Sequence, residues 1–293
     1  MKSNILIAIS NIVLDDTFEL KSFYENRNRA NSMGKALEEY IKDIFGGTKA
    51  ENNEGKRLEI LEETFSYMGN QNNPPDSIIR GGDAIEVKKI ESYGSSIALN
   101  SSYPKAKLYS NSPMITTTCR ECEKWEEKDI IYVVGVVPKI NGEEGKKLRS
   151  LVMVYGEDYA ADCSIYEKIK NVIREGIISI PNVEFSETKE LGRVNKVDPL
   201  GITYLRIRGM WGIDNPMNVF NYIKQINTEN EFELIVIINE RKYLSFPEEE
   251  RKKFEDLLNK VTKLEMKDVK IKDPNNPAQL KKAKLITFER EKI

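Results

Sequence analysis

QNNPPDSIIRGGDAIEVKKIE, residues 71–91, joins a turn-rich segment to a stretch with the pattern of a short β-hairpin. If the hairpin turn is centred on Gly81, Asp76 pairs with Glu86. Directly opposed side chains of an antiparallel pair lie about 5 Å apart on one face. Lys88 is two residues beyond Glu86 and shares that face, whereas the apolar residues beside it point into the core. The stretch therefore predicts two carboxylates and a lysine on one side of a hairpin.

These three side chains have the composition of a metal site. Two carboxylates that close repel each other unless a cation neutralises them. Mg²⁺ commonly takes one or two protein carboxylates and completes its shell with waters and phosphate oxygens. Such an ion activates a bound water and stabilises charge on a phosphate, and Lys88 would orient that water or help to deprotonate it. The pattern favours a phosphodiesterase site; the alternative is a solvated hairpin face.

The composition of the chain limits its chemistry. Among 293 residues there is no histidine, which excludes Ser–His and Cys–His nucleophilic catalysis and His-liganded zinc. Apolar residues make up 40%, enough for a sizeable core, and the formal net charge is −2. That balance argues against a globally basic nucleic-acid binder but allows a basic cleft. No P-loop or G-x-G-x-x-G pattern occurs, so no nucleotide cofactor is expected.

The cysteines and the N-terminus indicate a cytoplasmic location. Three cysteines, an odd number, are typical of reduced thiols. Cys119 and Cys122 have zinc-knuckle spacing, but only Cys163 remains as a further thiolate ligand, so we expect no structural zinc. Residues 1–16 resemble a signal peptide only faintly, because Asn11 interrupts the apolar run and acidic residues follow it, and we expect a core helix instead. No segment approaches the about 18 apolar residues of a membrane span.

Helical and strand patterns are mixed along the chain, which predicts an α/β fold with a mixed central sheet flanked by helices. With no repeat and no convincing linker, we expect a single elaborated domain over residues 1–293. A capping box at residues 245–248 is expected to open the last of the helices. The expected helices span residues 31–45, 57–64, 162–175 and 247–261, and the expected strands span residues 129–137, 151–155 and 232–239.

Several stretches carry a resemblance to a known family. Pro75-Asp76, nine residues and Glu86-Val87-Lys88 resemble the PD-(D/E)xK nuclease motif. With further stretches, this motif makes residues 25–220 similar to the NgoPII-type type II restriction endonucleases. The stretches are NRANSMGKALEEYIKDIF (28–45), GNQNNPPD (69–76), GDAIEVKKIES (82–92), LNSSYPKAKLYSNSPMI (99–115), KDIIYVVGVV (128–137) and ELGRVNKVDPLGITYLRIRGMW (190–211).

The resemblance implies a restriction-endonuclease-like PD-(D/E)xK core at about residues 28–175 and Mg²⁺-dependent cleavage of double-stranded DNA, with GGCC as the family's site. It implies Asp76 and Glu86 as metal ligands, the Val87 carbonyl as a further ligand and Lys88 as the catalytic lysine. Many such nucleases add a carboxylate from an N-terminal helix, and here Glu38 flanks the apolar stripe whereas Glu39 points nearly opposite it. Asp83, offset from the face of Glu86, is expected to be solvated.

Two segments, residues 99–115 and 190–220, are the expected DNA contacts. Arg and Lys donate to guanine O6 and N7 in the major groove, which suits a G·C-rich site, and polar loops hold phosphates. For the arginines on the strand of the second segment, the alternative to DNA contact is the formation of salt bridges with carboxylates. The candidates are Asn100, Ser101, Ser102, Lys105 and Lys107 in a loop, Arg193 and Lys196 in a second loop, Arg206 and Arg208 on one face of a strand, and Arg80 at the hairpin turn.

A palindromic site implies a homodimer, with one active site for each strand. A cognate DNA methyltransferase as a partner is implied by the family alone. Three other readings stay open at this point. They are a PD-(D/E)xK nuclease that recognises DNA structure in repair or recombination, a DNA-binding protein with an inactive site, and an α/β protein whose acidic hairpin is merely solvated.

Overall fold

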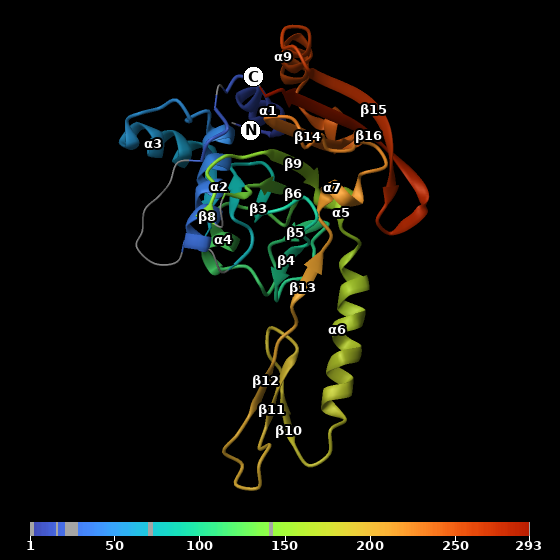
Figure 1. Ribbon diagram of the computed structural model, residues 1–293. Coiled ribbons are helices and arrows are strands. Elements are labelled where there is room, and N and C mark those ends of the chain that lie inside the picture. The colour runs from blue at the N-terminus through green and yellow to red at the C-terminus, as the bar shows by residue number, and fades with distance from the viewer. Residues whose placement is uncertain (1–2, 16, 21–28, 70–72, 141–142, 293) are drawn as a thin grey trace.

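A large mixed β-sheet lies at the centre of the computed structural model, which describes residues 3–15, 17–20, 29–69, 73–140 and 143–292 (Figure 1). Residues 28 and 70–72, which belong to stretches that carry the resemblance, lie outside the described residues. The β3–β6 and β9–β14 pairs are parallel and the other pairs are antiparallel. The strand order is β1 (Phe65–Met68), β2 (Ser77–Ile79), β3 (Ala84–Ile90), β6 (Glu127–Val136), β9 (Ser150–Tyr155), β14 (Phe232–Asn239), β16 (Asn276–Arg290) and β15 (Leu264–Asp273), with β5 (Lys107–Tyr109) paired to β6.

Helices cover both faces of this sheet. On one face, the apolar sides of α1, α2 and α9 pack against alternate residues of the strands, including Ile85, Val87 and Ile131. On the other face, short helices and β4 pack against the intervening residues, such as Ala84 and Ile130. The helices are α1 (Ile5–Val13), α2 (Arg29–Gly46), α3 (Glu54–Thr64), α4 (Thr117–Glu121), α5 (Gly156–Tyr159), α6 (Cys163–Ile178), α7 (Pro216–Val219), α8 (Glu240–Ser245) and α9 (Glu248–Leu258).

An arm, residues 163–207, projects from the body (Figure 1). It consists of α6 and a small antiparallel sheet of β10 (Glu184–Ser186), β11 (Gly192–Asn195) and β12 (Leu205–Ile207). At the base of the arm, β13 (Trp211–Ile213) pairs with β4 (Ile97–Asn100). Elsewhere in the body, a small ladder joins β7 (Lys139–Ile140) to β8 (Glu143–Glu144). The arm therefore returns the chain to the body beside the strands that follow β3.

The expected elements are confirmed, apart from one helix start. Helix α2 ends at Gly46, and Gly47 follows with a φ of +68°, which is typical of a glycine that ends a helix. The N-terminal segment is a buried helix, capped by Asn4. The expected capping box at residues 245–248 is wrong: Ser245 ends α8, which the sequence did not predict, and its hydroxyl donates to the Lys242 carbonyl at 2.7 Å. No described helix is long and apolar enough to cross a membrane.

Candidate active site

The β2–β3 hairpin has the register that the sequence predicted. Ser77 pairs with Ile85, and the Asp76 N–H donates to the Ile85 carbonyl at 3.0 Å. The turn is centred on Gly81, whose φ of +65° lies in the left-handed region that favours glycine. Since each pair is symmetric about Gly81, Asp76 stands opposite Glu86. The local sequence alone thus accounts for the carboxylate pair.

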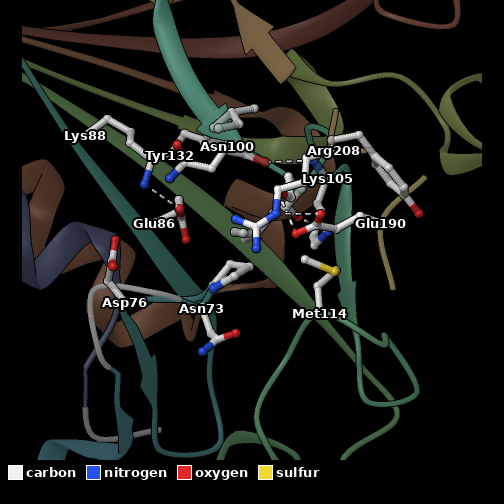
Figure 2. A pocket seen from close by; sticks show the side chains of 16 residues that line it. Asn73, Asp76, Glu86, Lys88, Asn100, Lys105, Met114, Tyr132, Glu190 and Arg208 are labelled. Carbon is white, nitrogen blue, oxygen red and sulfur yellow. Dashed lines mark hydrogen bonds and ion pairs between the residues drawn. The ribbon is translucent and has the colours of Figure 1, made fainter. Parts of the chain in front are cut away.

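Asp76, Glu86 and Lys88 line one cavity of about 300 Å³, at the point where the hairpin faces away from the α2 side of the sheet (Figure 2). The Lys88 Nζ lies 2.6 Å from Glu86 Oε1. Asp76 Oδ2 accepts a hydrogen bond of 2.6 Å from the backbone N–H of Val87. The side chain of Val87 points into the opposite core, so its backbone alone faces the site.

Burial and like charge together make this pair of carboxylates costly without a cation. Burial raises the pKa of Asp76 well above its ordinary value, and the neighbouring charge of Glu86 raises it further. Burial lowers the pKa of Lys88, but the charges of Glu86 and Asp76 outweigh it, and the pKa of Lys88 ends above its ordinary value. The Lys88 ammonium is therefore the one positive charge of the hairpin face, and it contacts one of the two carboxylates directly.

One carboxylate oxygen of this pair points to a missing ligand. Glu86 Oε2 is buried and has no hydrogen-bond partner among the described residues, which is an unfavourable state for a buried polar oxygen. Within the described ranges, no group of three or more Cys, Asp and Glu side chains is arranged to hold a metal. The donors that remain are the Asp76 and Glu86 carboxylates and backbone oxygens such as that of Val87. Two carboxylates completed by waters and phosphate oxygens suit Mg²⁺.

Of the two glutamates on α2, the predicted site residue Glu38 is not among the residues that line the cavity. Burial raises its pKa, and the charges of Lys88 and Glu86 act on it from the hairpin. Glu39 is instead occupied by Lys42 and Arg57, at 2.7 and 2.8 Å. The helix thus directs Glu38 towards the hairpin and Glu39 towards α3.

A second lysine lines the cavity from the opposite wall. Lys105 is buried, its N–H donates to the Tyr132 hydroxyl at 2.7 Å, and its Nζ donates to Ser102 Oγ at 2.7 Å. Burial lowers the pKa of Lys105 to about 8. Asn100, Ser101 and Ser102 also line the cavity. Asn100 is the last residue of β4 instead of part of the expected loop. Four of the predicted residues are therefore brought together at the carboxylate pair.

Glu190 of the arm and Arg208, which directly follows the arm, form a third wall (Figure 2). Arg208 Nε lies 3.2 Å from Glu190 Oε2, and Arg206 lies 3.7 Å from the other carboxylate oxygen. The Ser101 hydroxyl also donates to Glu190, at 3.2 Å. The two arginines share a face and pair with a carboxylate, which was the alternative for this strand. Glu190 was not among the predicted site residues. The sequence signal that could have identified it is the expected pairing of these two arginines with a carboxylate.

Four other predicted DNA contacts lie away from the cavity. Lys107 and Arg193 lie in strands β5 and β11 instead of the expected loops. Lys196 pairs with Glu184 beyond the end of β11. The Arg80 guanidinium donates to backbone carbonyls at the end of α3 and the start of β1. Lys107 pairs with Glu127 at 2.7 Å, and the Arg193 guanidinium lies 3.6 Å from the centre of the Tyr204 ring.

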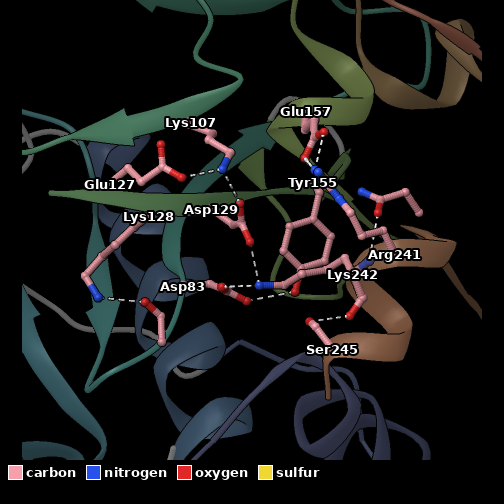
Figure 3. A network of polar contacts seen from close by, with 12 residues as sticks. Asp83, Lys107, Glu127, Lys128, Asp129, Tyr155, Glu157, Arg241, Lys242 and Ser245 are labelled. Atoms are coloured by element: carbon pink, nitrogen blue, oxygen red, sulfur yellow. Dashed lines mark hydrogen bonds and ion pairs between the residues drawn. The ribbon is translucent and has the colours of Figure 1, made fainter. Parts of the chain in front are cut away.

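Asp83 is not solvated, contrary to expectation. It is 4% exposed and accepts hydrogen bonds from Lys242 Nζ at 2.6 Å and from the Tyr155 hydroxyl at 2.8 Å (Figure 3). Lys242 also donates to Asp129, at 2.7 Å. Helix α8 carries Lys242, which lies 159 residues along the chain from Asp83, so no local sequence pattern predicts this contact. The network anchors the turn end of the hairpin that carries Glu86.

All three cysteines are free, with Cys119 buried, Cys122 partly buried and Cys163 exposed. Among the described residues, no three Cys, Asp and Glu side chains are grouped so that they could hold a metal ion. Cys119 instead contributes to the core on the second face of the sheet.

Comparison with known proteins gives a consistent result. The model of a family described as "NgoPII restriction endonuclease" matches residues 3–272. The type II restriction enzyme NgoPII of Neisseria gonorrhoeae is 54% identical over 285 residues, which cover 97% of this chain and 99% of that relative. The match extends beyond the stretch at about residues 25–220 on which the resemblance was first seen. No solved structure matches the chain.

Proposed function

Because the chain belongs to the NgoPII restriction endonuclease family, and is thus a type II restriction endonuclease acting on double-stranded DNA, we propose that it cleaves GGCC sites with Mg²⁺ held by Asp76 and Glu86. The observation that carries the metal assignment is the buried, unpartnered Oε2 of Glu86 beside Asp76. The Val87 carbonyl and waters complete the donor set. When bound, the ion activates water for attack and stabilises charge on the phosphate.

The side chains around this pair have separate tasks in the proposal. Lys88 holds the attacking water and one phosphate oxygen from a position 2.6 Å from Glu86. Glu38 adds a carboxylate from α2, where the charges of Lys88 and Glu86 act on it. Lys105 donates to a phosphate from the opposite wall, where Ser102 and the Tyr132 hydroxyl hold it. A phosphodiester between the two lysines would meet positive charge on both sides.

DNA enters, in this proposal, between the cavity and the arm. Arg206 and Arg208 are the bidentate donors best placed for guanine, and their pairing with Glu190 keeps them extended towards the cavity. Asn100, Ser101 and Ser102 hold phosphates near the cleaved bond. The predicted contacts farther from the cavity, Lys107, Arg193, Lys196 and Arg80, bind flanking phosphates.

The remaining expectations are part of the same proposal. The sheet and α2 form a PD-(D/E)xK core within one elaborated domain, and residues 99–115 and 190–220 form the recognition segments. A palindromic site is cut by a homodimer with one active site for each strand. A cognate methyltransferase protects host DNA.

The test is a digest of unmethylated phage DNA by the purified protein with Mg²⁺ and with EDTA. We expect discrete bands only with Mg²⁺, and sequenced ends that give GGCC. Asp76→Asn should abolish both cleavage and Mg²⁺ binding measured by calorimetry, whereas Asp268→Asn, at an exposed ion pair far along the chain, should change neither. Smearing in Mg²⁺ would contradict site-specific cleavage, and unchanged Mg²⁺ binding by Asp76→Asn would contradict the metal assignment.

A further inference from the structure

The arm carries an unusual share of the exposed apolar surface. Of twenty large apolar side chains exposed among the described residues, eleven lie in the arm, between residues 165 and 205. Scattered exposed apolar residues are normal, but a concentration of this kind marks an interaction surface. Helix α6 contributes Ile165, Ile169, Val172, Ile173 and Ile178 to it.

One side of α6 packs on the arm and another is free. The packed side carries Ile177, which is buried, and Arg174, whose guanidinium donates to three carbonyls of residues 188–191. The free side carries Ile165, Ile169 and Val172, which are 46%, 50% and 58% exposed. At 3.6 residues per turn these three lie on a stripe well separated from the packed side.

The spacing of this stripe is that of a helix–helix seam. Ile165, Ile169, Val172 and Gly176 follow one another at intervals of four, three and four residues, the repeat by which two helices pack side by side. No atom lies within 4 Å of where a Cβ of Gly176 would be, so a partner side chain has room there. Four seam positions over residues 165–176 suit a partner helix of the same length, which a second copy of α6 provides.

The charges beside the stripe favour a second copy in one orientation. Lys168 and Glu175 lie seven residues apart on the same flank of the stripe, and both are exposed. In an antiparallel pair of identical helices, a flank meets the same flank of its partner, so Lys168 of each copy faces Glu175 of the other. A parallel pair brings no such opposite charges together. The stripe is therefore complementary to itself in the antiparallel orientation.

We propose that two copies of the chain associate through antiparallel α6 helices, with Ile165, Ile169, Val172 and Gly176 as the seam and two Lys168–Glu175 pairs beside it. The inference rests on the proposed function in one respect, the need for two active sites on one palindrome. The seam alone buries less surface than a standard interface of about 800 Å² per partner. We therefore expect a dimer with a Kd in the micromolar range, which DNA binding stabilises.

This arrangement also places the active sites at a useful distance. Tyr166, in the first turn of α6, stacks on Tyr103 at 5.2 Å between ring centres, and Tyr103 lines the cavity of Asp76 and Glu86. Each cavity thus lies near the start of an α6 helix. In an antiparallel pair, Ile165 of each copy lies beside Gly176 of the other, so the two Ile165 residues are about 17 Å apart along the helix axis. That is less than one turn of DNA, about 34 Å, so both cavities could reach one short site.

The test is the oligomeric state of the full chain, measured by sedimentation without DNA or metal. We expect a concentration-dependent dimer for the parent and a monomer for Ile169→Asp. Leu58→Asp, at a helix position of matching exposure on α3, should dimerise like the parent. Lys168→Glu should raise the Kd of the dimer about tenfold or more, and Lys168→Glu with Glu175→Lys should restore it.

Each outcome decides the inference. A monomeric parent, a dimeric Ile169→Asp or a double charge reversal without rescue would overturn it. Circular dichroism of each variant checks that the exposed substitutions leave the fold intact. Asp76→Asn should remain a dimer and fail to cut DNA. If the parent protein dimerises but never cuts DNA, that result counts against the proposed function and not against the α6 interface.

Discussion

Lys105→Met should make the protein more stable and a weaker DNA binder at the same time. Lys105 is 8% exposed, and burial lowers its pKa from 10.5 to about 8. Each pH unit of difference corresponds to about 1.4 kcal/mol, so the buried ammonium costs the folded state about 3 kcal/mol at pH 7. Methionine fills a similar space without that charge.

The size of the effect follows from this cost. Allowing for imperfect packing, we expect the free energy of unfolding to rise by about 2 kcal/mol, which for a chain of this length corresponds to about 3 °C in Tm. The sign depends on pH. At pH 7 Lys105 is charged in both states, but between about pH 8 and 10.5 only the unfolded chain binds the proton, so the parent gains stability as pH rises. The advantage of the variant should therefore be smaller at pH 9.5 than at pH 7.

The assays are chemical denaturation at the two pH values and DNA binding at pH 7. For the denaturation assay, Lys107→Met is the matched control, because the hydrogen bond with Glu127 raises the pKa of Lys107 and its loss should be neutral or slightly destabilising. Lys105→Arg should keep DNA affinity. A Lys105→Met variant that unfolds at the same or lower denaturant concentration at pH 7, or whose advantage is equal at pH 9.5, would refute the reasoning.

Three further predictions concern the hairpin and the DNA. Lys88→Ala should fold and bind DNA but cleave it at least about 100-fold more slowly in single-turnover assays; normal cleavage would remove its catalytic role. Lys242→Met leaves Asp83 and Asp129 without their shared cation and should lower the free energy of unfolding by about 3 kcal/mol, whereas Lys252→Met, at a side chain 70% exposed, should change it by less than about 0.5 kcal/mol. DNA affinity should fall steeply with salt in titrations, since phosphate contacts release counterions, and a flat response would contradict the proposed contacts.

The parts of the site that the sequence predicted are those made by neighbouring residues. The alternation of side chains in β3 and the turn at Gly81 place Asp76, Glu86 and Lys88 on one face whatever surrounds them. The same holds for α2, whose period directs Glu38 and Glu39 to different neighbours. Local geometry of this kind depends on a few backbone torsions, so it can be predicted from the local sequence independently of the rest of the fold.

Other features depended on segments that are far apart along the chain. The burial of Asp83 needs Lys242 from α8, and the low pKa of Lys105 results from the packing of the segment after β4 on Tyr132. The salt bridges of Arg206 and Arg208 with Glu190 follow from the pairing of β11 with β12, in which Gly192 stands opposite Ile207.

The free stripe of α6 is visible in the sequence as a spacing of apolar residues, but a buried helix has the same spacing. Tertiary packing decided which side of that helix met the arm and which side met solvent, because burial is set by what the rest of the chain places against it. The sequence by itself determined the carboxylate pair and the period of the helix. The tertiary structure decided which charges are buried and which apolar side chains are left exposed.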